Sequence, residues 1–213
     1  MANVLDYKKE HKDLYSPKNQ PSIINVPEIA FVAVEGRGDP NEENGEYKKA
    51  VELLYNIQYT IKMSKKGTST PGGYFDYVVP PLEGLWWLAD SKSDFRDKSK
   101  YQWISMIRLP EFADAKVFKW ACDEASKKKK IDTGKAYFFK FSEGLCVQCM
   151  HIGPFDNEPE TLAKMDKYIS ENNLIKDFSD KRRHHEIYLS DPGKVDPAKM
   201  KTVLRLPVRE MRG

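Results

Sequence analysis

A pattern of strand, turn, helix and hairpin occurs twice along this chain, and it limits the possible folds more than any other sequence feature. In the first copy, residues 28–35 are rich in β-forming side chains and end at a cluster of turn residues that begins at Gly36. Apolar residues in 46–66 recur every three or four positions, which predicts an amphipathic helix. Residues 73–80 and 101–109 predict the two strands of a hairpin with a long connection.

The second copy follows an intervening helix, whose basic end suits the negative end of the helix dipole. Asn157, Pro159 and Glu160 together are typical of a helix start. The segment Ser142-Glu-Gly144 is typical of a hairpin turn. The predicted elements of this copy are a hairpin of residues 136–141 and 145–152, a helix from Asn157, and strands over 184–190 and 202–208.

Two pairs of positions relate the copies to each other. Gly36 corresponds to Gly153 at an offset of 117 residues, and Asp76 corresponds to Glu186 at an offset of 110. The alternative is that an α+β protein contains two such runs by chance. We interpret the match as an internal repeat, which predicts an α+β fold of two pseudo-symmetric βαββ repeats. Both helices then cover one face of the sheets, and the central groove between the repeats is the expected ligand cleft.

The same pattern sets the expected organisation of the chain. The first residues show no clean period, so we expect an arm that runs over the surface and precedes a single domain. The expected boundaries are the arm over 1–26, the domain over 27–213, repeat one over 27–110, the intervening helix over 111–130 and repeat two over 136–210.

Composition excludes several partners and locations. The chain has 35 basic and 32 acidic residues, and this small excess is too low for a protein that binds a phosphate backbone, so we expect no nucleic acid. No run approaches the roughly 20 apolar residues of a membrane helix, so we expect no membrane. Three cysteines and an N-terminus without an apolar leader predict a cytoplasmic protein, which we expect to be a monomer or weak dimer.

The sequence predicts neither a metal site nor a cofactor. Cys146 and Cys149 are three residues apart in a predicted strand, where such residues point to opposite faces. The adjacent His184 and His185 fail as a metal pair for the same reason, unless one of them works alone with distant ligands. His151 is expected to be a surface or hydrogen-bonded histidine. The chain lacks a Walker loop, a dinucleotide fingerprint and a nucleophile elbow.

Glu186 is the acidic residue that we expect at the centre of a binding site. In the predicted strand 184–190, Ile187 is expected to face the helices, whereas His184, Glu186 and Tyr188 face the groove. A strand carboxylate is ordinarily a solvated charge. Among aromatic rings, it can instead pair with a planar cation, or keep a raised pKa and serve as a base.

Aromatic residues make up 12% of the chain and cluster in two regions, 74–103 and 137–141. Half of the rings in a strand are expected to pack into the core, and the adjacent Trp86 and Trp87 cannot both face one way. Met150 is either a packing residue or a ligand contact. The expected ligand-binding residues are Trp86, Trp87, Tyr101, Trp103, Phe139, Met150, Asp76 and His184.

Several motifs, in order, make this sequence resemble the GyrI-like small-molecule-binding domains, which occur alone and fused to bacterial multidrug-responsive regulators. The resemblance covers nearly the whole chain from about residue 27. The segments that carry it are VEGRGDP at 34–40, PLEGLWW at 81–87, MHIGP at 150–154, EIYLSDP at 186–192 and DPAKMKTVLRLPV at 196–208.

The resemblance implies two βαββ repeats around a central cleft, with a buried glutamate that meets cationic or aromatic ligands and matches Glu186 by motif. The Trp-rich insert and the Lys-rich intervening helix place the chain in the stand-alone subgroup. Similar members hydrolyse cyclopropanoid DNA-alkylating natural products, which implies a bacterial detoxification enzyme for a flat aromatic substrate.

Two functions remain open at this point. In the first, Glu186 activates water to open a strained cyclopropane, and Tyr188 or Tyr137 donates a hydrogen bond to the dienone oxygen of the substrate. In the second, the protein binds and sequesters drugs without turnover, and Glu186 is only a counter-charge. A third function, gyrase inhibition, follows only from the family name.

Overall fold

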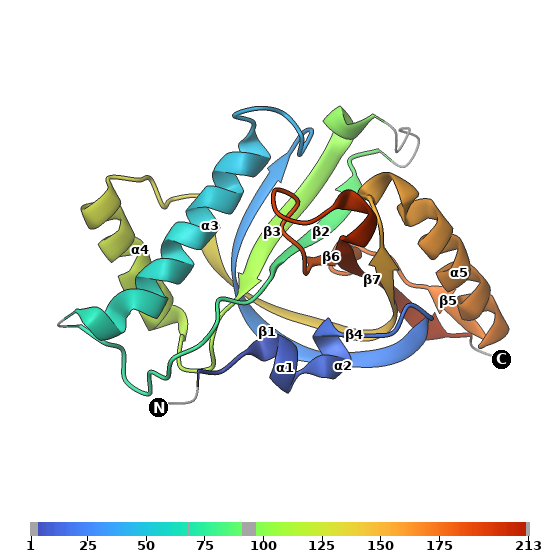
Figure 1. Cartoon of the computed structure of the whole chain (residues 1–213), viewed down its shortest axis with the longest axis horizontal. Coiled ribbons are helices and arrows are strands. Elements are labelled where there is room, and N and C mark those ends of the chain that lie inside the picture. Colours follow the sequence, from blue (N-terminus) through green and yellow to red (C-terminus); the bar gives the residue numbers. More distant parts are fainter. Residues whose placement is uncertain (1–3, 68, 91–96, 212–213) are drawn as a thin grey trace. The chain divides into compact units, whose positions relative to one another are not determined.

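The computed structural model describes residues 4–67, 69–90 and 97–211 (Figure 1). The chain divides into two compact units. The first unit contains residues 1–7 and 29–141, and the second contains residues 8–28 and 142–213. None of the helices among the described residues combines the length and the apolar character that a bilayer span requires.

The first unit contains the predicted strand, helix and hairpin in the predicted order. Strand β1 (Ser22–Arg37), which belongs to this unit from residue 29 onward, is followed by helix α3 (Glu46–Met63) and then by the hairpin strands β2 (Leu82–Leu88) and β3 (Tyr101–Arg108). Strand β3 is antiparallel to both β1 and β2, so it lies between them. The first part of β4 (Ala136–Ile152) completes this unit after helix α4 (Ala115–Lys129).

Two predicted boundaries in the first unit were wrong. The first hairpin strand was expected over 73–80, but Tyr77 forms only an isolated bridge with Leu5, and β2 begins after Pro80 and Pro81. Proline has no backbone N–H to donate to a strand ladder, which explains why the strand starts beyond this pair. The predicted connection includes residues 91–96, which lie outside the described residues.

Helix α4 also begins later than the expected residue 111. The Asp114 side chain accepts hydrogen bonds of 2.9 Å from the backbone N–H groups of Lys116 and Val117. These bonds satisfy two of the N–H groups that lack a partner within the helix, and they place the N-cap at Asp114.

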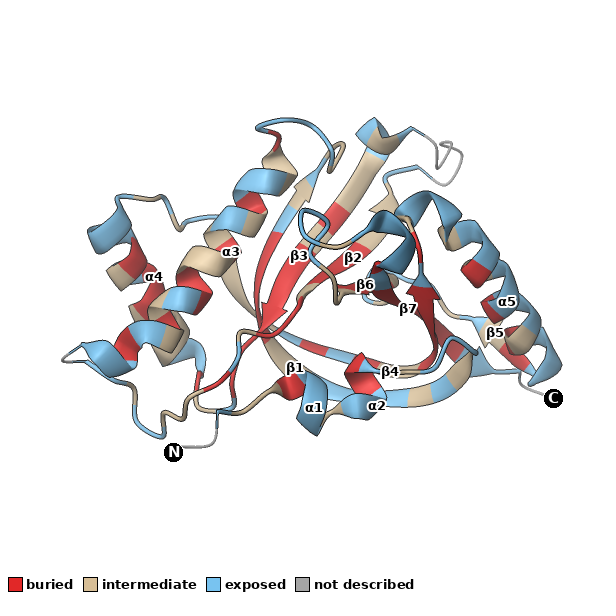
Figure 2. Cartoon of the chain, in the orientation of Figure 1, coloured by how far each residue is buried: buried red, intermediate tan, exposed pale blue. Residues whose placement is uncertain are grey.

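The second unit is built around strand β7 (Lys201–Glu210), which pairs with three other strands. Its partners are the later part of β4, the short strand β5 (Leu174–Lys176) and strand β6 (His184–Tyr188), all antiparallel. Helix α5 (Glu158–Glu171) follows the short 3-10 turn Phe155–Asn157. Figure 2 shows buried positions along β7, whereas much of α5 is exposed.

Helix α5 packs against one face of this sheet. Its buried residues Met165 and Ile169 form an apolar cluster with Val147, Cys149, Leu204 and other residues of β4 and β7. His151 adds a polar connection, because its Nδ1 lies 2.9 Å from the Thr161 hydroxyl of α5 and its Nε2 lies 3.0 Å from the Pro154 carbonyl. This buried histidine is hydrogen-bonded, which is one of the two environments expected for it.

The segment before β1 differs from the expected surface arm. It contains the short helices α1 (Tyr7–Glu10) and α2 (Lys12–Tyr15), and three of their apolar side chains are buried. These side chains are Tyr7, Leu14 and Tyr15.

Strand β4 corrects the predicted hairpin at residues 136–152. The chain does not reverse at Ser142-Glu-Gly144, and β4 continues as one strand of 17 residues. Gly144 has φ 71°, a left-handed conformation that glycine adopts without steric cost. This conformation explains why a sequence that is typical of a turn occurs inside a strand, and it accompanies burial of the Glu143 side chain.

Glu143 is the centre of a buried polar network in the second unit. Its Oε2 accepts a hydrogen bond of 2.9 Å from Arg205 and lies 3.0 Å from His185 Nδ1. Arg205 also donates to the Gln148 side chain at 3.1 Å and to the Leu14 carbonyl at 3.0 Å. Burial raises the pKa of Glu143, but His185 and Arg205 outweigh burial and hold the pKa at about 2.

We expect Glu143 to make the free energy of unfolding depend on pH. Its pKa in the folded protein is about 2, below the ordinary value of 4.5, so it stabilises the fold above pH 4.5 and loses this effect as the pH falls toward 2. The difference corresponds to about 3 kcal/mol. Urea unfolding at pH 7 should show Glu143→Gln less stable than wild type by at least about this amount, and the gap should narrow below pH 4.5.

The control for this experiment is Glu171→Gln, which removes an exposed carboxylate of α5. It should change the free energy of unfolding little at any pH. A gap between wild type and Glu143→Gln that stays constant from pH 7 to pH 2 would contradict the low pKa.

The close approach of β1 to a tryptophan gives a second prediction. A Cβ atom at Gly36 would lie 2.3 Å from Cη2 of the fully buried Trp103, so Gly36→Ala must displace the indole. We expect a loss of about 1–3 kcal/mol, measured as a lower Tm. Gly72→Ala is the control, because a Cβ there meets no atom within 4 Å. Equal Tm values for the two variants would exclude this packing.

Candidate functional site

Glu186 lies on the face of β6 toward which α5 packs. It is paired across the ladder with Leu204, which belongs to the apolar cluster of α5. Directly opposite residues on antiparallel strands project to the same face. The sequence expectation that Ile187 faces the helix was therefore wrong, since Ile187 is paired with Val203 on the other face. Alternation separates two faces, but it cannot tell which face a helix covers when both contain apolar residues.

Two neighbours on the same strand contact the Glu186 carboxylate. The Tyr188 hydroxyl donates a hydrogen bond of 2.8 Å to Oε2, and His184 Nε2 lies 3.2 Å from Oε1. The side chain of Glu186 is 14% exposed, so the carboxylate is sheltered but accessible. The predicted residues His184, Glu186 and Tyr188 therefore meet, because side chains two apart on a strand share a face.

Sequence reasoning missed two residues that lie beside this group. The Phe155 ring meets the Tyr188 ring edge to face at 5.9 Å. Glu158, the first residue of α5, has a carboxylate oxygen within 4.8 Å of ligand atoms of His184 and Glu186. The helix-start pattern at Asn157 predicted where α5 begins, but it contained no signal that the first turn lies against β6.

In the first unit, three of the predicted aromatic residues lie on the face of the sheet that α3 covers. The Tyr47 ring of α3 lies 5.4 Å from Trp86 and 5.2 Å from Trp103, and the Tyr101 ring lies 5.8 Å from Trp86. Trp103 is fully buried and belongs to the core, whereas Trp86 and Tyr101 are half-buried. Tyr47 was missed, because helix periodicity marked it only as an apolar residue of α3.

Other predicted aromatic residues of this unit lie on the opposite face of its sheet. Tyr137 and Phe139 pack against the apolar cluster around Leu85 and Met106. Trp87 points away from Trp86, as predicted, and donates a hydrogen bond of 2.7 Å to Gln102. Burial, aided by the charge of Glu35, raises the pKa of Tyr137 to about 12, so its hydroxyl stays protonated at neutral pH.

Asp76 and Met150 do not join the residues that were expected around them. Asp76 precedes β2 and forms ion pairs with Lys62 and Lys65, which together lower its pKa, chiefly through the hydrogen bond from Lys65. It is therefore not a strand counterpart of Glu186. Met150 is paired with Val203, so it lies on the sheet face opposite Glu186.

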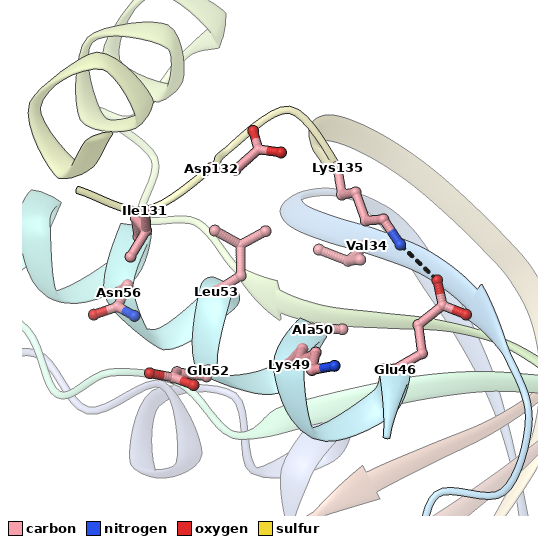
Figure 3. A pocket seen from close by; sticks show the side chains of 10 residues that line it. All are labelled: Val34, Glu46, Lys49, Ala50, Glu52, Leu53, Asn56, Ile131, Asp132 and Lys135. Atoms are coloured by element: carbon pink, nitrogen blue, oxygen red, sulfur yellow. Dashed lines mark hydrogen bonds and ion pairs between the residues drawn. The ribbon is translucent and has the colours of Figure 1, made fainter. Parts of the chain in front are cut away.

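A separate pocket of about 440 Å³ lies in the first unit, between α3 and residues 131–135 (Figure 3). A salt bridge of 2.7 Å between Glu46 and Lys135 crosses it and lowers the pKa of Glu46. The lining also contains Lys49, Glu52 and Asp132, so it carries three acidic and two basic side chains in all. None of the predicted site residues lines this pocket.

The comparisons with known proteins agree on the fold. A crystal structure of an uncharacterized conserved protein from Listeria innocua is 50% identical, with a TM-score of 0.91 over 96% of this chain and 100% of that chain. Two crystal structures described as a hydrolase from Listeria innocua are each 48% identical, with TM-scores of 0.88 and 0.89. They cover 96% and 97% of this chain and 100% of their own. Curated proteins gave no match.

The family model of the GyrI-like small molecule binding domain matches residues 19–209, which begins before the expected residue 27 and spans most of the chain. The observed elements fit the α+β fold that the motifs predicted. The chain belongs to the family of GyrI-like small molecule binding domains.

Proposed function

We propose that this protein is a hydrolase that opens the strained cyclopropane of cyclopropanoid DNA-alkylating natural products. The observation that carries the proposal is the sheltered Glu186 carboxylate, with the Tyr188 hydroxyl at 2.8 Å and the His184 imidazole at 3.2 Å. The two similar crystal structures described as a hydrolase support hydrolysis in general, and the family supports a small-molecule substrate.

The proposed reaction adds one water molecule across the three-membered ring. Glu186 accepts a proton from water while the water oxygen forms a bond to the methylene carbon of the cyclopropane. The C–C bond of the ring breaks, and its electron pair moves into the conjugated dienone, which becomes a phenolate. The proton then passes from Glu186 through solvent to the phenolate, so the carboxylate is regenerated. Strain in the substrate lowers the barrier, and one positioned base supplies the remaining assistance.

Tyr188 is assigned a positioning role in this reaction. Its hydroxyl donates to Glu186, so it fixes the direction of the second carboxylate oxygen. The attacked carbon and the dienone oxygen lie at opposite ends of the dienone ring. A hydroxyl that is hydrogen-bonded to the base lies near the attacked carbon, so it is far from the dienone oxygen. The sequence expectation that Tyr137 donates to the dienone oxygen stays a prediction, and its protonated phenol is chemically able to donate a hydrogen bond.

Binding of a flat substrate is assigned to aromatic stacking. The half-buried Trp86 and Tyr101 offer ring surface that the core does not fully cover. Aromatic stacking contributes about 0.5–1.5 kcal/mol per ring pair beyond the area that it buries. A detoxification role follows from this substrate class, because opening the cyclopropane removes the alkylating group.

Glu186→Gln tests the base directly. The amide keeps the size of the side chain but cannot accept a proton from water, so turnover of a spirocyclopropyl dienone should fall by about 100- to 10,000-fold. The dissociation constant of the substrate should change only a few-fold. Chromatography of the ring-opened product gives turnover, and tryptophan fluorescence gives binding.

The matched control is Glu160→Gln, which removes an exposed carboxylate on α5 and should leave turnover unchanged. Unchanged turnover in Glu186→Gln would remove Glu186 as the base. Stoichiometric binding without any product from wild type would instead support the alternative function, a protein that sequesters flat aromatic or cationic ligands. The description of the family as small-molecule-binding favours that alternative.

Tyr188→Phe tests the positioning role. Loss of the hydrogen bond leaves the Glu186 carboxylate free to rotate, and we expect kcat to fall roughly tenfold with KM little changed. Tyr59→Phe is the control, because Tyr59 is 47% exposed on α3 and belongs to the first unit. An unchanged kcat in Tyr188→Phe contradicts the assignment.

A further inference from the structure

Three side chains from two elements of the second unit bring metal-binding atoms together. His184 and Glu186 project from the same face of β6, and Glu158 comes from the first residue of α5. One ligand atom from each lies within 4.8 Å of the other two. We propose that Glu158, His184 and Glu186 bind a divalent transition-metal ion of the Zn²⁺ class, with solvent completing the coordination.

The types of ligand decide which cation fits. One imidazole nitrogen and two carboxylate oxygens are ligands that Zn²⁺, Co²⁺ and Ni²⁺ accept. Ca²⁺ takes six to eight oxygen ligands, and Mg²⁺ prefers an octahedron of oxygen atoms, so three side chains that include a nitrogen suit these ions poorly. Catalytic zinc sites likewise use three protein ligands and leave a position open.

The surroundings of the three residues favour a preorganised site. His184 Nε2 and Glu186 Oε1 are already 3.2 Å apart, close to the spacing of two ligands on one ion. Tyr188 holds the other oxygen of Glu186, and Phe155 packs against the Tyr188 ring. Such outer hydrogen bonds orient metal ligands and raise affinity. The side chains of His184 and Glu186 are 19% and 14% exposed, which weakens screening by solvent while leaving access for an ion.

The charge at the site also favours a cation. The N-terminal end of α5 carries a partial positive charge of roughly 0.5, which opposes a metal ion. The two carboxylates carry two negative charges and outweigh it. Cation binding by these three side chains does not require the proposed hydrolysis.

Cation binding has a consequence for the proposed hydrolysis. This consequence rests on the proposed function, whereas cation binding itself does not. A metal ion that takes an oxygen of Glu186 withdraws the carboxylate from its role as a base. The same cation is therefore expected to slow ring opening, in competition with the reaction rather than as part of it. Glu186 then links the two activities.

The test is calorimetric titration of the whole chain with ZnCl₂ in the absence of substrate. Wild type should bind one Zn²⁺ per chain, and Glu158→Gln and His184→Gln should each weaken binding at least about tenfold. Glu160→Gln is the matched control, because it removes the same charge from an exposed position of α5. Equal affinity in wild type, Glu158→Gln and Glu160→Gln, or no binding by wild type, overturns the proposal.

Co²⁺ separates this site from the three free cysteines, which are buried but are potential ligands. A Co²⁺ complex without a thiolate charge-transfer band supports the three proposed ligands, whereas a thiolate band overturns them. The Zn²⁺ concentration that inhibits ring opening by half should be at least about tenfold lower for wild type than for Glu158→Gln. Equal inhibition of wild type and Glu158→Gln would overturn the predicted effect of Zn²⁺ on ring opening. If wild type shows no hydrolysis, the proposed function fails, but the Zn²⁺ titration still decides the proposed metal site.

Discussion

Arg205 lies near the middle of β7, where its side chain is only 2% exposed, and an unpaired charge in such a place costs several kcal/mol. Glu143 supplies the opposite charge, and the Gln148 side chain and the Leu14 carbonyl accept further hydrogen bonds from Arg205. This network connects α2, β4 and β7, and His185 adds β6. Each of these elements is therefore held by a contact that water cannot replace without a large penalty.

The network also explains the placement of the candidate site. His185 is fixed on one face of β6 by Glu143, and side chains alternate along a strand. The residues on either side, His184 and Glu186, must therefore project to the opposite face, toward α5. A slip of one residue along β7 would bury Glu186 beside Arg205 and leave His185 without its partner. The buried charges of Glu143 and Arg205 favour one pairing register of β6 with β7, and this register places the Glu186 carboxylate on the face toward α5.

Periodicity predicted helices α3 and α5, strands β3, β6 and β7, and the meeting of His184, Glu186 and Tyr188. It failed where a residue has two possible roles. Ser142-Glu-Gly144 has the composition of a turn, but the strand continues through it, with Gly144 in a left-handed conformation and Glu143 buried beside Arg205. Glu158 could not be assigned to the site, because contact between α5 and β6 is set by tertiary packing, which a single sequence does not encode locally.

His151 also helps to position the residues near the start of α5 that lie beside the candidate site. Its ring joins the end of β4 to the Pro154 carbonyl and to Thr161 in the second turn of the helix. The carbonyl can only accept, so Nε2 carries a proton, whereas a hydroxyl can either donate to Nδ1 or accept from it. Both ring nitrogens are therefore used to hold the start of α5 to the end of β4. Phe155 and Glu158, which lie between these two attachment points, are therefore held from both sides by a single side chain.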